Sequence, residues 1–196
     1  MRIIFFDLET GGMDGKKHAI TQFASIVVNP DFSVVEELEI KIKFRPENAD
    51  PEALAVNHYD QELWAAEAIS PLEARRKIYA QFNRYKDRRN VSARTGKAYN
   101  VAQLAGHNAH KFDRPFLGDW WERLGKPDWC PADWRVLDTQ MLAHWYCHVH
   151  GTEPENMKLE TLCEFFDITV DGPAHDALVD VRMTIELAKH LTKKGG

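Results

Sequence analysis

The stretch RIIFFDLETGG at residues 2–12 decides the fold of this 196-residue chain. Residues 2–7 form an apolar run rich in β-formers, which predicts a buried strand. Asp7 and Glu9 end that strand, and side chains two residues apart on a strand project to the same face. Two hard oxygen donors on one face suit Mg²⁺ or Mn²⁺. An ordinary strand-end turn explains this pair equally well when it is considered alone.

The rest of the chain predicts one mixed α/β domain over residues 1–196, with an insertion at 86–100. Further strands are expected at 20–28, 33–44, 101–105 and 135–137. Helices are expected from residue 51 onward and at 71–87, 112–125, 139–147, 158–166 and 175–192. Residues 87–100 are polar and predict a loop. This order indicates a central mixed sheet of about five strands flanked by helices.

Composition excludes several classes of protein. The chain has 25 basic and 30 acidic residues and a formal net charge of −5, which argues against a protein that coats nucleic acid through a basic surplus. Its three cysteines include no Cys-x-x-Cys pair, so a reducing compartment is expected. The sequence has neither an 18-residue apolar run nor a signal-peptide pattern. These features predict a cytoplasmic protein without membrane segments.

Two more acidic positions stand beside predicted helices. Asp113 lies near the start of the helix expected at 112–125, where a simple N-cap explains it locally. Asp180 lies inside the helix expected at 175–192, beside an apolar ridge. His175 would point in a different direction on one continuous helix, so we expect it on the preceding loop or at the helix start. A loop histidine can exchange a proton near neutral pH, although an ordinary surface histidine fits the same pattern.

Three motifs in this order resemble the DEDDh family of 3′-to-5′ exonucleases, which includes polymerase proofreading subunits, ribonuclease T and the three-prime repair exonucleases. They are FDLETG at 6–11, the HN and FD pairs within 107–113, and His-x-Ala-Leu-x-Asp at 175–180. Weaker similarity extends the resemblance to roughly residues 1–57 and 101–190. Asn57 stands where many members have a histidine. The resemblance implies a ribonuclease H-like fold.

The same resemblance implies the chemistry. It implies that two divalent ions, Mg²⁺ or Mn²⁺, are bound by Asp7, Glu9, Asp113 and Asp180, and that His175 is the general base. Contacts to the terminal nucleotide are expected from Leu8, Thr10, Asn57 and Asn108. The expected reaction is hydrolysis of the terminal phosphodiester bond, which releases nucleoside 5′-monophosphates from single-stranded DNA 3′ ends.

Alternatives remain open for the activity and partners. An RNA-trimming exoribonuclease could use the same residues, although Thr10 directly after Glu9 resembles the DNA-processing members. A non-catalytic binding or polymerase-accessory module would be expected to lack a ligand, and all four acids and His175 are present. A DNA polymerase or repair protein could be a partner, and the sequence leaves the oligomeric state open.

Three further features have ordinary explanations as well as functional ones. Residues 75–97 hold nine basic residues against one acid. A solvated helix face and loop explain them, while the alternative is contact with a phosphate backbone through Arg88, Arg89 and Arg94. His144, His148, His150 and Cys147 could suggest zinc or a helix end with exposed histidines. Trp129 and Trp134 could cap the fold or stack on a base.

Overall fold

The computed structural model describes residues 1–125, 130–172 and 176–193. Its centre is a five-stranded sheet with the strand order β3-β2-β1-β6-β7. The strands are β1 (Ile3–Thr10), β2 (Ile20–Val28), β3 (Val34–Lys41), β6 (Leu104–Gly106) and β7 (Leu137–Asp138). The first three pair in antiparallel fashion, whereas β6 and β7 run parallel to β1. The predicted α/β fold with a mixed five-stranded sheet is confirmed.

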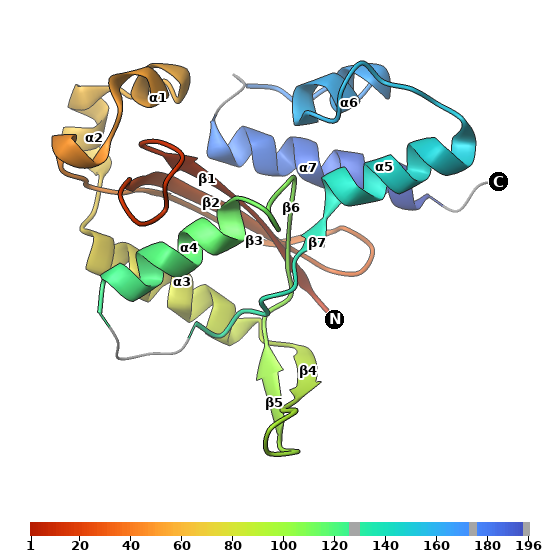
Figure 1. Cartoon of the computed structure of the whole chain (residues 1–196), viewed down its shortest axis with the longest axis horizontal. Helices are drawn as coiled ribbons and strands as arrows, with labels where there is room; N and C mark the ends of the chain where they lie inside the picture. The colour runs from red at the N-terminus through yellow and green to blue at the C-terminus, as the bar shows by residue number, and fades with distance from the viewer. Residues whose placement is uncertain (126–129, 173–175, 194–196) are drawn as a thin grey trace.

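Helices cover both faces of this sheet (Figure 1). They are α1 (Pro51–Val56), α2 (Gln61–Glu67), α3 (Pro71–Arg84), α4 (Asp113–Arg123), α5 (Thr139–His150), α6 (Leu159–Phe165) and α7 (Ala177–Thr192), with a 3₁₀ turn at Pro46–Asn48. The helical region after residue 50 is therefore two short helices followed by α3. Across the described residues, no helix combines the length and the apolar character needed to cross a membrane.

Strict alternation along β1 divides the core. Ile4, Phe6 and Leu8 belong to an apolar cluster that includes residues of α3 and α4 on one side of the sheet. Phe5 belongs to the cluster on the opposite side, with Val181 and Ile185 of α7 and small residues of β2 and β6. Asp7 and Glu9 have the same parity as Phe5, so their side chains project from the face that α7 covers.

The segment 87–100, predicted as a loop, is a β-hairpin, and this prediction was wrong. Strands β4 (Arg88–Val91) and β5 (Ala98–Val101) pair in antiparallel fashion as a separate two-stranded sheet. Between them, the Ser92 hydroxyl accepts a hydrogen bond from the Thr95 amide, and Gly96 has a φ of +66°, which glycine adopts without strain. The high polarity hid a short alternating pattern, because neither face of this hairpin is fully buried.

A buried aspartate anchors the hairpin to the domain. The Asp133 side chain is 0% exposed and accepts hydrogen bonds or ion pairs from Arg88 Nε at 3.1 Å, Arg135 Nη2 at 3.2 Å and Asn90 Nδ2 at 3.1 Å. Burial raises the pKa of Asp133, but the hydrogen bonds from Arg135 and Asn90 and the charge of Arg88 outweigh it, so the pKa lies below its usual range. Arg88 therefore has a structural role at the root of the hairpin.

We expect Arg88→Ala to lower the free energy of unfolding by about 2 kcal/mol, because the buried Asp133 carboxylate loses one of its two guanidinium partners. Urea denaturation would measure this change. Arg89→Ala is the matched control, since Arg89 is the exposed neighbour on the same strand, and its effect should stay within about 0.5 kcal/mol. Equal effects of the two substitutions would contradict a structural role for Arg88.

Candidate active site

Asp7 and Glu9 lie on the half of β1 that approaches its carboxyl end. Asp7 is paired with Ala24 of β2, whose small side chain leaves room on the α7 face, and Glu9 is paired with Gln22. The register shifts only between Glu9 and Thr10, so both acids keep the regular alternation of the strand. Glu9 is buried and Asp7 is half-buried. The prediction that they share one face is therefore confirmed by the strand geometry.

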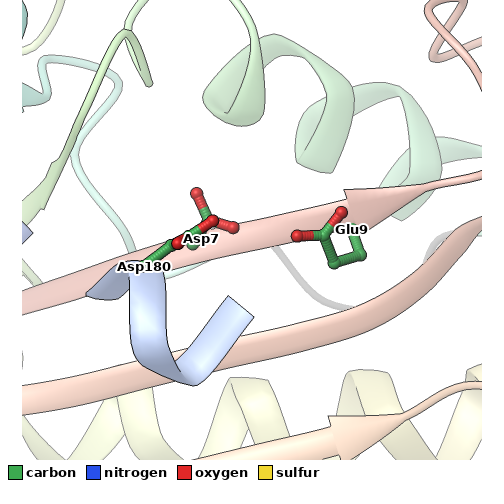
Figure 2. Close-up of side chains that lie close together, drawn as sticks. All are labelled: Asp7, Glu9 and Asp180. Carbon is green, nitrogen blue, oxygen red and sulfur yellow. The ribbon is translucent and has the colours of Figure 1, made fainter. Parts of the chain in front are cut away.

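The start of α7 brings a third carboxylate to this pair. Asp176 caps the helix by accepting hydrogen bonds from the amides of Leu178 and Val179. Asp180 follows in the first turn and is buried. One carboxylate oxygen from each of Asp7, Glu9 and Asp180 lies within 4.8 Å of the other two, and Figure 2 shows the three side chains converging from β1 and α7. Two elements distant in sequence thus form one acidic group.

Asp113 lies next to this group without being one of the three. It is the first residue of α4, after Phe112 at the N-cap position, so helix capping does not explain it. Its side chain is only 5% exposed, and the backbone N–H of Leu8 donates a hydrogen bond to it. Its charge raises the pKa of both Asp7 and Glu9. The structure therefore places all four predicted acids in one region, three of them in closest proximity.

Burial and mutual repulsion make these carboxyl groups hard to ionise. Burial is the largest cause of the raised pKa of Glu9, followed by the charges of Asp180 and Asp113, and the pKa reaches about 8. Burial likewise raises the pKa of Asp113 to about 7, although amide N–H groups partly offset it. The pKa of Asp7 lies well above its usual range for the same reasons, burial first and then Asp113.

This donor set fits a divalent cation. A hard ion of the Mg²⁺ or Mn²⁺ type binds carboxylate oxygens, and its charge would offset the repulsion that raises these pKa values. Within the ranges that the structure describes, Asp7, Glu9 and Asp180 are the one group in which three potential ligand atoms come this close. Among the described residues, the alternative zinc ligands His144, Cys147, His148 and His150 do not bring three potential ligand atoms this close together.

The loop before α4 is held by Asp138, which the sequence analysis did not single out. The Asp138 carboxylate accepts hydrogen bonds from the amides of Asn108, His110 and Gln140, each at 3.0 Å. Asn108 has a φ of +55°. The His107 ring lies between the Thr139 hydroxyl and the Met157 carbonyl oxygen, at 2.9 and 2.8 Å. Asp138 at the end of a short strand was the available signal, and it fixes the path of the chain into Asp113.

The residues expected to contact the nucleotide surround the end of β1. The Leu8 side chain is buried in the core cluster of α3 and α4. The Thr10 hydroxyl donates to the Gly12 carbonyl oxygen, and the Asn57 amide donates to the Thr10 carbonyl oxygen at 2.9 Å. Asn57, after α1, therefore orients the backbone directly beyond Glu9. Their contacts with a nucleotide remain predictions.

The remaining predicted positions divide between the described and undescribed parts. His175 and Trp129 lie outside the described residues. Trp120 and Trp121 are buried in the core, whereas Trp134 is 66% exposed. Arg88 pairs with Asp133, while Arg89 and Arg94 are exposed on the hairpin.

Comparison with known proteins agrees with this geometry. A sequence profile described as Exonuclease (RNase_T) matches residues 4–188. The chain belongs to the Exonuclease family. The resemblance to DEDDh enzymes is thereby confirmed, and it assigns the chain to the 3′-to-5′ exonucleases, which are hydrolases of phosphodiester bonds.

Individual proteins are similar to nearly the whole of this chain. Ribonuclease T of Haemophilus influenzae is 28% identical, over 98% of this chain and 82% of that protein. Protein NEN4 of Arabidopsis thaliana is 27% identical, over 96% of this chain and 66% of its own length. The crystal structure of Escherichia coli exonuclease I in complex with a dT13 oligonucleotide superposes with a TM-score of 0.73 at 20% identity. That alignment covers 98% of this chain and 41% of exonuclease I, so this chain spans about two fifths of it.

The raised pKa values predict a stability that depends on pH and metal. The pKa of Glu9 changes from about 4.5 in the unfolded chain to about 8 in the folded protein. Its stabilising contribution is thus complete below pH 4.5 and is lost as the pH rises through 8. In EDTA, the melting temperature of Glu9→Gln should exceed that of wild type by a margin that grows from pH 5 to pH 9. Thermal melts followed by circular dichroism measure this.

Added Mg²⁺ or Mn²⁺ should raise the melting temperature of the wild type more at pH 8 than at pH 5.5, because the ion binds the ionised carboxylates. Glu62→Gln is the control. Asp60 and Glu62 have the same Asp-x-Glu spacing as Asp7 and Glu9, but they are exposed. A margin for Glu9→Gln that is independent of pH would refute the repulsion among these acids.

Proposed function

We propose that this chain hydrolyses single-stranded DNA from its 3′ end, one nucleotide at a time, with two divalent metal ions bound by Asp7, Glu9, Asp113 and Asp180. The single observation that carries the proposal is the convergence of three largely buried carboxylates from β1 and α7, with Asp113 beside them. An exposed acidic cluster would need no counter-ion, but buried acids with raised pKa values call for a cation.

The carboxylates and the histidine have separate roles in this proposal. The four carboxylates hold the ions, which when bound would make an attacking water more acidic and stabilise the negative charge at the leaving oxygen. His175 accepts the proton of the water. The water oxygen forms a bond to the terminal phosphorus while the bond from phosphorus to the 3′ oxygen breaks and that oxygen takes up a proton. The products are a nucleoside 5′-monophosphate and a strand shortened by one nucleotide.

RNA is the second candidate substrate. The relative that shares 82% of its length with this chain is called ribonuclease T, whereas the exonuclease I structure was solved with a DNA oligonucleotide. The four acids would serve either nucleic acid, because the cleaved bond is the same. Only contacts to the sugar 2′ position distinguish the two.

Incubation with 5′-labelled DNA and RNA of one sequence tests this function. We expect a ladder that shortens from the 3′ end in Mg²⁺ or Mn²⁺ and no shortening in EDTA. Glu9→Gln and Asp113→Asn should lower kcat by about 100-fold or more, because each removes a charged ligand. Glu62→Gln should leave kcat unchanged. Activity that survives EDTA or either active-site substitution would refute the proposed mechanism, and the faster substrate ranks DNA against RNA.

His175 can be tested separately from the metal ligands. We expect His175→Ala to lower kcat by about 10²- to 10⁴-fold, the usual contribution of a general base. The stabilisation of the protein by Mg²⁺ should persist, because the carboxylates remain. The matched control is His148→Ala, an exposed histidine of α5. A loss of metal stabilisation together with activity would instead identify His175 as a ligand.

A further inference from the structure

The β4–β5 hairpin projects from the body of the molecule on the side where β1 begins (Figure 1). Arg2, just before β1, pairs with Asp87, just before β4, at 2.7 Å, so the root of the hairpin lies beside the start of β1. Asp7 and Glu9 lie towards the opposite end of that strand. Five residues of strand span about 17 Å, so the root of the hairpin lies about that far along β1 from Asp7. The rest of the hairpin projects away from the body of the molecule beyond this root (Figure 1).

The charge of this hairpin is entirely positive. Residues 88–101 include four basic residues and no acidic residue. Arg88 is bound to Asp133 at the root. Arg89, Arg94 and Lys97 are exposed, and within the described chain their side chains have no ion-pair partner. Two acids at the root of the hairpin, Asp87 and Asp133, are themselves bound to arginines. The hairpin thus presents three cations whose charge no neighbouring acid neutralises.

Exposed aromatic side chains belong to the same region, on the side of the hairpin that carries Asn90. Trp134 is 66% exposed, and the Arg135 guanidinium lies over its ring, 5.5 Å from the centroid. Arg135 also donates a hydrogen bond to the side-chain oxygen of Asn90 in β4, and Asn90 is paired with Tyr99 of β5, which is 40% exposed. Trp134 contacts Arg135, Arg135 contacts Asn90, and Asn90 is paired with Tyr99, so these neighbours connect the body of the domain to the middle of the hairpin.

We propose that this hairpin and Trp134 form a second nucleic-acid-binding site, which holds single-stranded DNA or RNA at a distance from the carboxylates and without metal. Guanidinium groups bind phosphates in a bidentate manner, and flat aromatic rings stack on unpaired bases of any sequence. Cations without stacking rings would suit an acidic protein equally well. The exposed Trp134 beside Arg135 favours a nucleic acid with unstacked bases.

The proposal rests on the proposed function in that one strand would occupy both sites. A dinucleotide bound at the carboxylates is too short to reach the root of the hairpin, about 17 Å along β1 from Asp7, even when its bases are unstacked. A 30-nucleotide strand is long enough to reach it. The second site therefore makes affinity depend on strand length and leaves the chemistry at the 3′ end unchanged.

The test compares Arg89→Ala/Arg94→Ala/Lys97→Ala and Trp134→Ala with the control Lys158→Ala/Lys193→Ala, which removes two exposed lysines elsewhere. Fluorescence anisotropy with 30-nucleotide dT and rU strands in EDTA measures binding without hydrolysis. The triple variant should bind about tenfold more weakly at low salt, and the slope of log affinity against log salt should decrease by about 2. Trp134→Ala should bind about fivefold more weakly. The control should bind like the wild type.

A second measurement separates this site from the catalytic one. In Mg²⁺, kcat/KM for a dinucleotide, which is too short to reach the hairpin, should be the same for the triple variant and the wild type. If no nucleotide is released from any strand, the proposed function is wrong. The second site is still tested in that case, because the anisotropy measurement does not depend on hydrolysis. Unchanged affinity of the triple variant for both long strands at every salt concentration would overturn the second site, and the basic surface would then suit an acidic protein. The DNA and RNA strands show which nucleic acid it prefers.

Discussion

Repulsion between the carboxylates of Asp7, Glu9 and Asp180 is the constraint on which the rest of the structure depends. These groups lie within 4.8 Å of one another in a largely buried region, where water screens their charges poorly. Apolar packing between α7 and the sheet, which includes Phe5, Val181 and Ile185, holds them together. Folding therefore holds the acids close together at a cost in stability. A bound cation would offset the repulsion between them, and this gain would favour binding of the cation.

Two other aspartates organise the loops around this centre. Asp138 collects three backbone amides and fixes the chain that leads into Asp113. Asp133 collects two guanidinium groups and an amide at the root of the hairpin. In both cases the donors saturate a carboxylate, in contrast to the acidic cluster, where the neighbours of each carboxylate are other acids. Aspartates of this chain thus differ according to what surrounds them: hydrogen-bond donors and arginines hold the pKa of Asp133 low, whereas burial and neighbouring acids raise the pKa of Asp7.

Much of this arrangement could be predicted from the sequence because it follows from periodicity. Alternation along residues 2–9 placed Asp7 and Glu9 on one face, and the apolar ridge of α7 placed Asp180 towards the sheet. The hairpin could not be predicted in the same way, because its stability comes from a hydrogen-bonded network with Asp133 rather than from a buried apolar face. The role of Asp138 was equally hidden, since two of its three partners are backbone amides about 30 residues away. Arg88 belonged to the predicted phosphate contacts, and only the fold showed that it pairs with a buried acid.

The alternation of side chains along β1 also determines which insertions and deletions the protein can tolerate. Removal of one residue between Ile3 and Asp7 would exchange the two faces of the strand, because side chains alternate with a period of two. Leucine and phenylalanine would then enter the acidic centre, and the carboxylates would enter the apolar core against α3 and α4. The turn at 92–96 is under no such restriction, since it joins two strands outside the main sheet. Insertions and deletions should therefore accumulate at the tip of the hairpin and be absent from β1.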